Sequence, residues 1–147
     1  MKKQTILITG CSHGGIGYAC AKYLKEIGHE VFASARVPSD VNKLKEEGFD
    51  TYLIDVNNED HITDALNDIL KKTNNKLDVV FNNAGYGSQV ALEDATWRSL
   101  SDQHTANVTG PVMLTNRLLP ALNKNSRLIF NGSILGIISV AFRGPYT

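Results

Sequence analysis

ILITGCSHGGIG, at residues 6–17, is the stretch that decides the fold of this chain. Its first three residues form an apolar run, which is typical of a strand buried on both faces of a parallel sheet. Four of the next nine residues are glycines, and they lead directly into an apolar pattern. Glycines let the backbone turn sharply and approach a phosphate, and the amides at a helix N-terminus attract anions. The stretch therefore predicts a strand, a turn that binds a dinucleotide pyrophosphate, and a helix, with a purely structural turn as the alternative.

The same alternation of strand and helix continues along the chain. The first helix is expected to end at Gly28, and its buried face is expected to comprise Ile16, Ala19, Cys20, Tyr23, Leu24 and Ile27. Further strands are expected at residues 31–34, 51–54, 79–81 and 127–130. Further helices are expected at 41–47, 58–70 and 93–122, the last with a break or kink at Gly110-Pro111. Five strands separated by helices predict an α/β fold, a doubly wound parallel sheet with helices on both faces.

Length and charge restrict the class of protein. The chain has 147 residues, enough for one domain at 1–147, and fifteen Lys plus Arg balance fifteen Asp plus Glu. A neutral chain lacks the basic footprint that nucleic-acid and membrane-surface binders need. Two cysteines supply neither a disulfide scaffold nor a structural zinc site, and the histidines show no metal-binding spacing. The apolar run after Met1-Lys2-Lys3 is too short for a signal peptide, so we expect a soluble, cytoplasmic protein without a metal.

Two motifs at the carboxyl ends of expected strands resemble those of a known family. The loop from Thr9 to Gly17 resembles the Thr-Gly-x-x-x-Gly-x-Gly loop of the short-chain dehydrogenase/reductase family, with one extra residue before Gly15. Residues 82–85, directly after the fourth strand, match the family's Asn-Asn-Ala-Gly motif, which ties the central sheet together beside the nicotinamide. The resemblance implies a Rossmann-type domain that binds a nicotinamide cofactor. The cofactor-binding residues that it indicates are Gly10, Ser12, His13, Gly15, Ile16, Gly17, Asp55, Val56, Asn83, Ala84 and Gly85.

The same resemblance implies an oxidoreductase. Asn107 opens an Asn-Val-x-Gly sequence similar to the family's helical motif, whose Asn helps to hold a proton-relay water. Ser133 precedes Tyr146 by thirteen residues, which matches the separation of the family's catalytic Ser and Tyr. In the implied mechanism Tyr146 exchanges a proton with the oxygen of a small carbonyl or alcohol substrate, Ser133 orients that oxygen, and hydride passes to or from the nicotinamide. The loop at residues 86–89 is expected to border the substrate pocket.

The end of the second strand bears on the choice of cofactor. An NAD-binding domain usually carries an acid there for the ribose 2′-hydroxyl, whereas this chain reads Ala33-Ser34-Ala35-Arg36. Arg36 can pair with a 2′-phosphate through charge-assisted hydrogen bonds, or it can be a solvated loop charge. The missing acid favours NADP(H) over NAD(H), with Ser34 and His13 as further candidate contacts.

The resemblance covers the first part of the family domain, so we expect the sheet to be incomplete at its C-terminal side. The family's Lys, four positions after Tyr146, would lie beyond Thr147, and the strand at 127–130 would be an exposed apolar edge. Two hypotheses follow, an NADP-dependent oxidoreductase or a catalytically inactive, truncated nucleotide-binding remnant. A sugar-nucleotide epimerase or dehydratase has little weight, because those enzymes differ in the glycine loop. Homo-oligomers are compatible with a full-length form and doubtful for this chain.

Overall fold

The sheet is built outward from the first strand in both directions. In the computed structural model, which describes residues 2–146, five parallel strands lie in the order β3-β2-β1-β4-β5. Their bounds are Thr5–Ile8 (β1), Glu30–Ala35 (β2), Asp50–Leu53 (β3), Leu77–Asn82 (β4) and Leu122–Phe130 (β5). The strand order reverses between β1 and β4, which is where open α/β sheets bind their ligands. The predicted Rossmann-type, doubly wound sheet is therefore confirmed.

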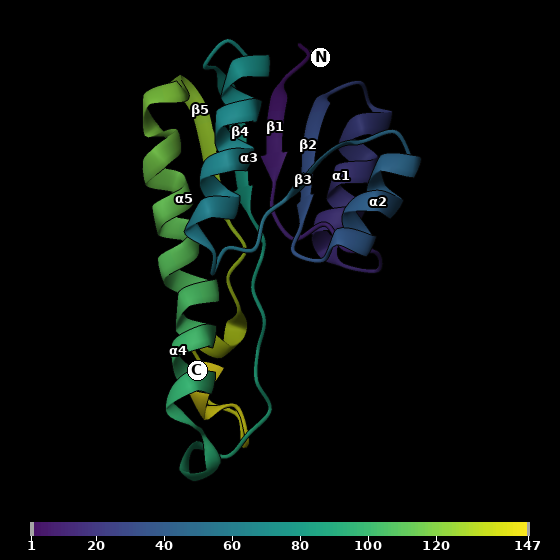
Figure 1. The fold of residues 1–147 in the computed structure, drawn as a ribbon. Coiled ribbons are helices and arrows are strands. Elements are labelled where there is room, and N and C mark those ends of the chain that lie inside the picture. The colour runs from purple at the N-terminus through teal and green to yellow at the C-terminus, as the bar shows by residue number, and fades with distance from the viewer. Residues whose placement is uncertain (1, 147) are drawn as a thin grey trace.

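Helices cover the two faces of the sheet (Figure 1). Helices α1 (Ile16–Glu26) and α2 (Pro38–Glu46) pack on one face, over a core that contains Ile6, Ile8, Val31 and Leu44. Helices α3 (Glu59–Lys72) and α5 (Gly110–Leu118) pack on the other, over Leu7, Phe32, Val80 and Leu114. Neighbouring residues of β1 thus enter opposite cores, as expected of a strand buried on both sides.

The buried side of α1 differs from the expected one. Ile16 and Tyr23 are each 61% exposed, whereas Gly17 and Ala21 are buried. A Cβ atom on Gly17 would lie only 2.5 Å from the carbonyl oxygen of Gly10. Because the helix approaches the sheet this closely, its fully buried residues are small. Cys20 and Leu24 of the expected face still pack against the core as partly buried side chains, so the expectation is wrong only in part.

The long helical region is also only partly as expected. Helix α4 (Trp97–His104) continues through a π-helical turn at Thr105–Thr109 into α5, so Gly110-Pro111 does not break the helix. Pro111 has no N–H to donate to the preceding turn, and the wider turn lies directly before it. The helix ends at Leu118 and a 3₁₀ turn at Leu119–Ala121 leads into β5, so the expected helix end at residue 122 is wrong.

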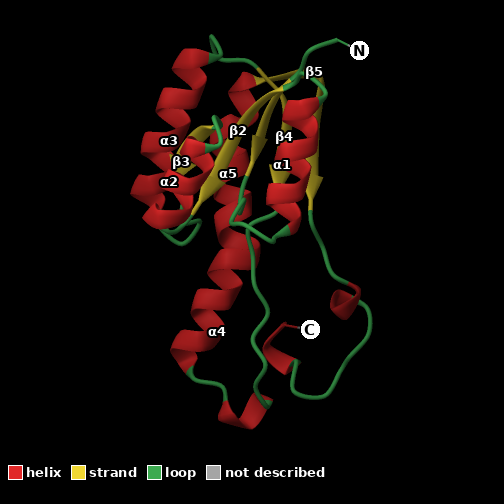
Figure 2. Cartoon of the chain, turned by 90° about the vertical axis from the view of Figure 1, so that its right-hand side faces the viewer, coloured by secondary structure: helices red, strands yellow, loops and turns green. Residues whose placement is uncertain are grey.

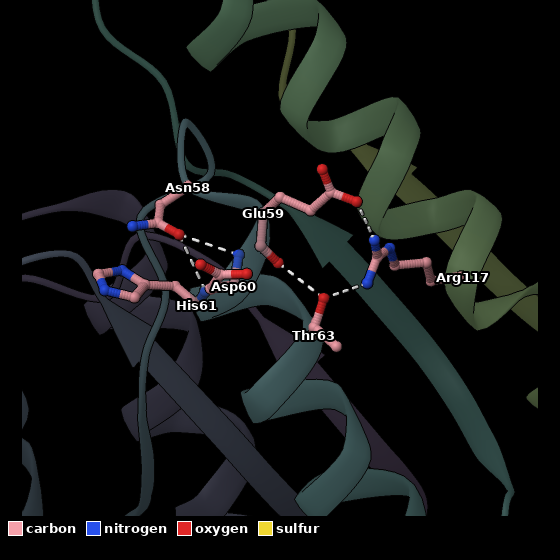
Figure 3. Close-up of polar contacts among 6 residues, drawn as sticks. All are labelled: Asn58, Glu59, Asp60, His61, Thr63 and Arg117. Carbon is pink, nitrogen blue, oxygen red and sulfur yellow. Dashed lines mark hydrogen bonds and ion pairs between the residues drawn. The ribbon is translucent and has the colours of Figure 1, made fainter.

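The start of α3 is fixed by two sets of polar contacts (Figure 3). Asn58 caps the helix, because its Oδ1 accepts hydrogen bonds from the backbone N–H groups of Asp60 and His61 at 2.9 and 3.2 Å. Arg117 of α5 bonds to both Glu59 and Thr63. The Arg117 contacts tie the first turns of α3 to α5.

Two segments extend beyond the carboxyl edge of the sheet, in the same direction as α4 (Figures 1 and 2). They are the stretch after β4, with a 3₁₀ turn at Leu92–Asp94, and the stretch after β5, with 3₁₀ turns at Ile134–Gly136 and Gly144–Tyr146. Strand β5 is an edge of the sheet as described, and its Leu128, Ile129 and Phe130 are 40–53% exposed, as expected. Among residues 2–146, no helix combines the length and apolar character needed to cross a membrane.

Candidate cofactor and catalytic site

The glycine loop between β1 and α1 forms the floor of the site. Gly10 has a φ of +71°, and a Cβ atom there would lie 2.8 Å from the Cα atom of Ala84, so only glycine fits this position. Cys11 is fully buried beneath the loop, and burial raises the pKa of its thiol to about 12. The thiol therefore stays protonated at neutral pH and is no nucleophile.

Asn83 joins the carboxyl ends of β1, β4 and β5. Its Nδ2 donates to the carbonyl oxygens of Thr9 and Gly10 at 2.9 and 3.0 Å. The Thr9 hydroxyl in turn accepts hydrogen bonds from the backbone N–H groups of Asn83 and Ala84. From β5, Asn131 donates to Asn83 Oδ1 at 3.0 Å. The role in tying the sheet together that the resemblance implied for Asn-Asn-Ala-Gly is thus present in these hydrogen bonds.

A cleft of about 630 Å³ lies along the carboxyl edge of the strands. This volume is in the range of ligand and cofactor sites. Gly17 is not among the described residues that line the cleft, because it lies beneath the loop against Asn83. The other candidate cofactor-binding residues line it together: Gly10, Ser12, His13, Gly15, Ile16, Arg36, Asp55, Val56, Asn83, Ala84 and Gly85.

Arg36 and His13 lie at one end of this cleft, at the end of β2 and in the glycine loop. Arg36 is exposed, and the His13 ring is held from outside the cleft by Glu47, with Nε2 2.5 Å from Oε1. Tyr18 donates to the second carboxylate oxygen of Glu47 at 2.9 Å. Hydrogen bonds from His13 and then from Tyr18 lower the pKa of Glu47, so this carboxylate is charged and paired. Ser34, a further candidate contact, is fully buried in β2, so it cannot reach a ligand in the cleft.

The loop after β3 forms the wall beside this end. Asp55 accepts a hydrogen bond from the backbone N–H of Asn57 at 3.0 Å, so its carboxylate shapes a local turn. Asn57, which sequence reasoning did not single out, lines the cleft and donates from Nδ2 to the carbonyl oxygen of Asp102 at 3.2 Å. The loop is therefore tied to α4 by Asn57.

The three candidate catalytic residues line one smaller cavity of about 280 Å³. Asn107 comes from the π-helical turn, Ser133 follows β5, and Tyr146 lies in the last 3₁₀ turn. The smaller cavity shares part of its wall with the cleft, namely Asn83, Ala84, Gly85, Tyr86 and Asn131. The cleft that Arg36 lines is therefore adjacent to the cavity that Ser133 and Tyr146 line.

Asn107 is already bonded within the protein. Its Oδ1 accepts from the backbone N–H of Tyr86 at 3.0 Å, and its Nδ2 donates to the Tyr86 carbonyl oxygen at 2.8 Å. Tyr86 lines both cavities, which agrees with the expectation that its loop borders the substrate pocket. In this structure Asn107 thus holds the loop, while Ser133 Oγ accepts a hydrogen bond from the N–H of Leu135 at 3.2 Å.

Sequence reasoning missed two further polar residues of the site. Asn131 follows β5 directly, so the rule that functional residues come just after strands could have found it. Gln103 of α4 is buried and bonds to both segments that border the smaller cavity, and nothing in its sequence context indicates this. Within the described part of the chain, no group of three or more His, Cys, Asp or Glu side chains could hold a metal ion.

Comparison with known proteins identifies relatives of the whole chain. Residues 4–147 match the sequence profile of the family described as short chain dehydrogenase. A crystal structure of a short-chain dehydrogenase from Streptomyces avermitilis superposes with a TM-score of 0.89 at 28% sequence identity. It covers 99% of this chain, and the match spans 55% of the Streptomyces chain.

Curated proteins with similar sequences are named as oxidoreductases. The uncharacterized oxidoreductase YbbO of Escherichia coli is 37% identical over 98% of this chain and 54% of its own length. A 3-ketodihydrosphingosine reductase of Bacteroides thetaiotaomicron is 35% identical over the full chain and 53% of its length. An NADPH-dependent 1-acyldihydroxyacetone phosphate reductase of Schizosaccharomyces pombe is 30% identical over 98% of this chain and 49% of its length. The chain thus spans about half the length of these relatives.

Proposed function

This chain belongs to the short-chain dehydrogenase/reductase family, and from that premise we propose that its function is hydride transfer between NADP(H) and a small carbonyl or alcohol substrate. The observation that carries the proposal is the shared wall of the two cavities. It brings a cleft that suits a dinucleotide into continuity with a polar cavity that contains a Ser and a Tyr.

The residues of the larger cleft suit a dinucleotide. The glycine loop ends at the N-terminus of α1, where free amides and the helix dipole favour a pyrophosphate. Asn83, Ala84 and Gly85 form the wall at the point where the cleft meets the smaller cavity, which suits the nicotinamide half.

The smaller cavity supplies groups for a carbonyl oxygen. The bound cofactor would supply or accept the hydride. The Tyr146 hydroxyl would donate a proton to the substrate oxygen or accept one from it, and the Ser133 hydroxyl would orient that oxygen through a hydrogen bond. Asn107 would keep Tyr86, and with it the wall between the two cavities, in position.

The proposal is tested by turnover. NADPH consumption should be followed with a panel of aldehydes and ketones. The panel includes 3-ketodihydrosphingosine and 1-acyldihydroxyacetone phosphate, because two relatives are named as reductases of these compounds. Oxidation of NADPH that depends on one of these substrates is the expected result. Binding of NADPH without turnover on any of them would contradict the oxidoreductase and support the nucleotide-binding remnant. If the chain does not bind the cofactor, both hypotheses fail.

Reversing the charge of Arg36 is expected to change the cofactor preference. In Arg36→Asp, two charge-assisted contacts to a 2′-phosphate would be replaced by repulsion, whereas NADH has no 2′-phosphate to lose. The affinity for NADPH should fall roughly 100-fold, a free-energy change of about 2.7 kcal/mol, and that for NADH by less than about threefold. Titration of the chain with each cofactor measures both values.

The matched control is Arg98→Asp, which makes the same change of charge at a side chain that is 91% exposed on α4. It should leave both affinities unchanged. An equal loss of NADPH and NADH affinity in Arg36→Asp would show that Arg36 does not select the 2′-phosphate.

A further inference from the structure

Gln103 is a buried polar side chain whose two ends bond to different segments. It lies in the last turn of α4 and is 2% exposed. Its Oε1 accepts a hydrogen bond from the backbone N–H of Ser88 at 2.7 Å, and its Nε2 donates to the carbonyl oxygen of Pro145 at 2.5 Å. Glutamine is mostly exposed in proteins, and a buried one is kept by its hydrogen bonds.

Both partners adjoin the smaller cavity. Ser88 belongs to the loop that follows β4, and Pro145 directly precedes Tyr146. The two segments touch beside Gln103, because a Cβ atom on Gly87 would lie 3.2 Å from the Tyr146 ring. They are also joined by a backbone hydrogen bond from Val90 to Phe142 at 2.9 Å. Figure 2 shows these segments alongside α4, beyond the edge of the sheet.

A second amide side chain holds the same loop one turn further along the helix. Asn107 binds both backbone groups of Tyr86, as described above. The hydrogen bonds of Asn107 therefore hold the loop but not the segment of Tyr146. Those of Gln103 join the loop to that segment. The position of the Tyr146 hydroxyl relative to the loop thus depends on Gln103.

We propose that Gln103 is a positioning residue, which sets the Tyr146 ring against the loop at residues 86–88 and so shapes the smaller cavity. The inference rests on the proposed function, since that function gives Tyr146 its task. Loss of the amide leaves the partly buried N–H of Ser88 and C=O of Pro145 without this partner. The two segments then lose the contact through Gln103 that joins them and turn these groups toward water. The cleft at the glycine loop is held by Asn83 and does not depend on Gln103.

Hydrogen exchange of the backbone amides tests the proposal without turnover. In Gln103→Leu, which keeps the volume but removes both hydrogen bonds, residues 86–90 and 140–146 should exchange roughly tenfold faster. Exchange at residues 9–17 and the affinity for NADPH should not change. The matched control is Arg98→Ala, which removes an exposed side chain from the same helix.

Gln103→Glu separates the two ends of the side chain. At neutral pH a carboxylate still accepts from Ser88 but repels the carbonyl oxygen of Pro145, so residues 140–146 should exchange faster and residues 86–90 should not. A protonated carboxyl can donate to Pro145, so acidification should restore slow exchange in the variant and leave the wild type unchanged. This variant keeps the shape of glutamine, so it also covers the case in which Gln103→Leu does not fold.

Steady-state kinetics test whether the position of Tyr146 that Gln103 sets affects the reaction. With a substrate found by the carbonyl panel, Gln103→Leu should lower kcat roughly tenfold or more and leave the KM for NADPH unchanged. Unchanged exchange in both segments, or faster exchange throughout the sheet, would overturn the inference. If the wild type shows no turnover, the proposed function fails, while the exchange pattern still decides whether Gln103 positions Tyr146.

Discussion

Replacing Tyr146 by phenylalanine is expected to lower carbonyl turnover by roughly 100- to 10,000-fold, the usual contribution of a general acid. The ring that packs against Gly87 is retained, so the wall of the smaller cavity keeps its shape. Only the hydroxyl is lost, and with it the proton for the substrate oxygen. The affinity for NADPH should change by less than about twofold, because Tyr146 is not among the described residues that line the larger cleft.

The measurement is NADPH oxidation at saturating substrate, with a cofactor titration of the same variant. Tyr23→Phe is the matched control, since it removes a hydroxyl from a tyrosine that is 61% exposed on α1. The control should keep full turnover. A Tyr146→Phe variant that retains wild-type turnover would remove Tyr146 from the reaction and leave its ring a structural role.

Gly17→Ala is expected to destabilise the fold and weaken cofactor binding together. A new Cβ atom would lie 2.5 Å from both the Gly10 carbonyl oxygen and Nδ2 of Asn83. One of these is backbone and the other is held by three hydrogen bonds, two donated and one from Asn131 to the same side chain. Neither can move without distorting the glycine loop. We expect a loss of about 1–3 kcal/mol in the free energy of unfolding, typical of overpacking.

The direction of this change is diagnostic. Alanine is favoured over glycine inside a helix by about 1 kcal/mol, so helix propensity alone predicts a gain in stability. Urea unfolding followed by circular dichroism gives the sign, and titration with NADPH should show a loss of roughly tenfold or more. Ala19→Val, on the exposed side of α1, controls for bulk added to the same helix. A Gly17→Ala variant at least as stable as the wild type would contradict the close approach.

Much of this fold could be predicted because its strands carry local signals. Each buried strand is a short apolar run, and polar or glycine residues follow it where the ligand site is expected. The contacts of Asn83 and the shared cavity of Ser133 and Tyr146 follow from motifs whose spacing reflects the fold. The same logic predicts that the loop at residues 86–89 borders the substrate pocket, and Tyr86 of this loop lines both cavities.

The errors arose where distant segments determine the outcome. Helical periodicity predicts an apolar face for α1, of which Cys20 and Leu24 do pack against the core. The short distance between α1 and the sheet places Gly17 and Ala21 at the closest contact instead of Ile16 and Tyr23. Ser34 looked accessible at the end of a strand, yet it is fully buried. Gln103 has no local signal, because its partners Ser88 and Pro145 are brought to it by two other segments of the chain.

The hydrogen bonds of Asn83 have a thermodynamic consequence. The same side chain that joins the ends of β1, β4 and β5 also forms part of the cleft wall, so a cofactor that binds there binds only the folded chain. Ligand concentration and folding equilibrium are then linked. At a free cofactor concentration of 100 times Kd, the unfolding free energy rises by about 2.7 kcal/mol. The cellular supply of nicotinamide nucleotide would therefore help to determine how much of this protein survives proteolysis.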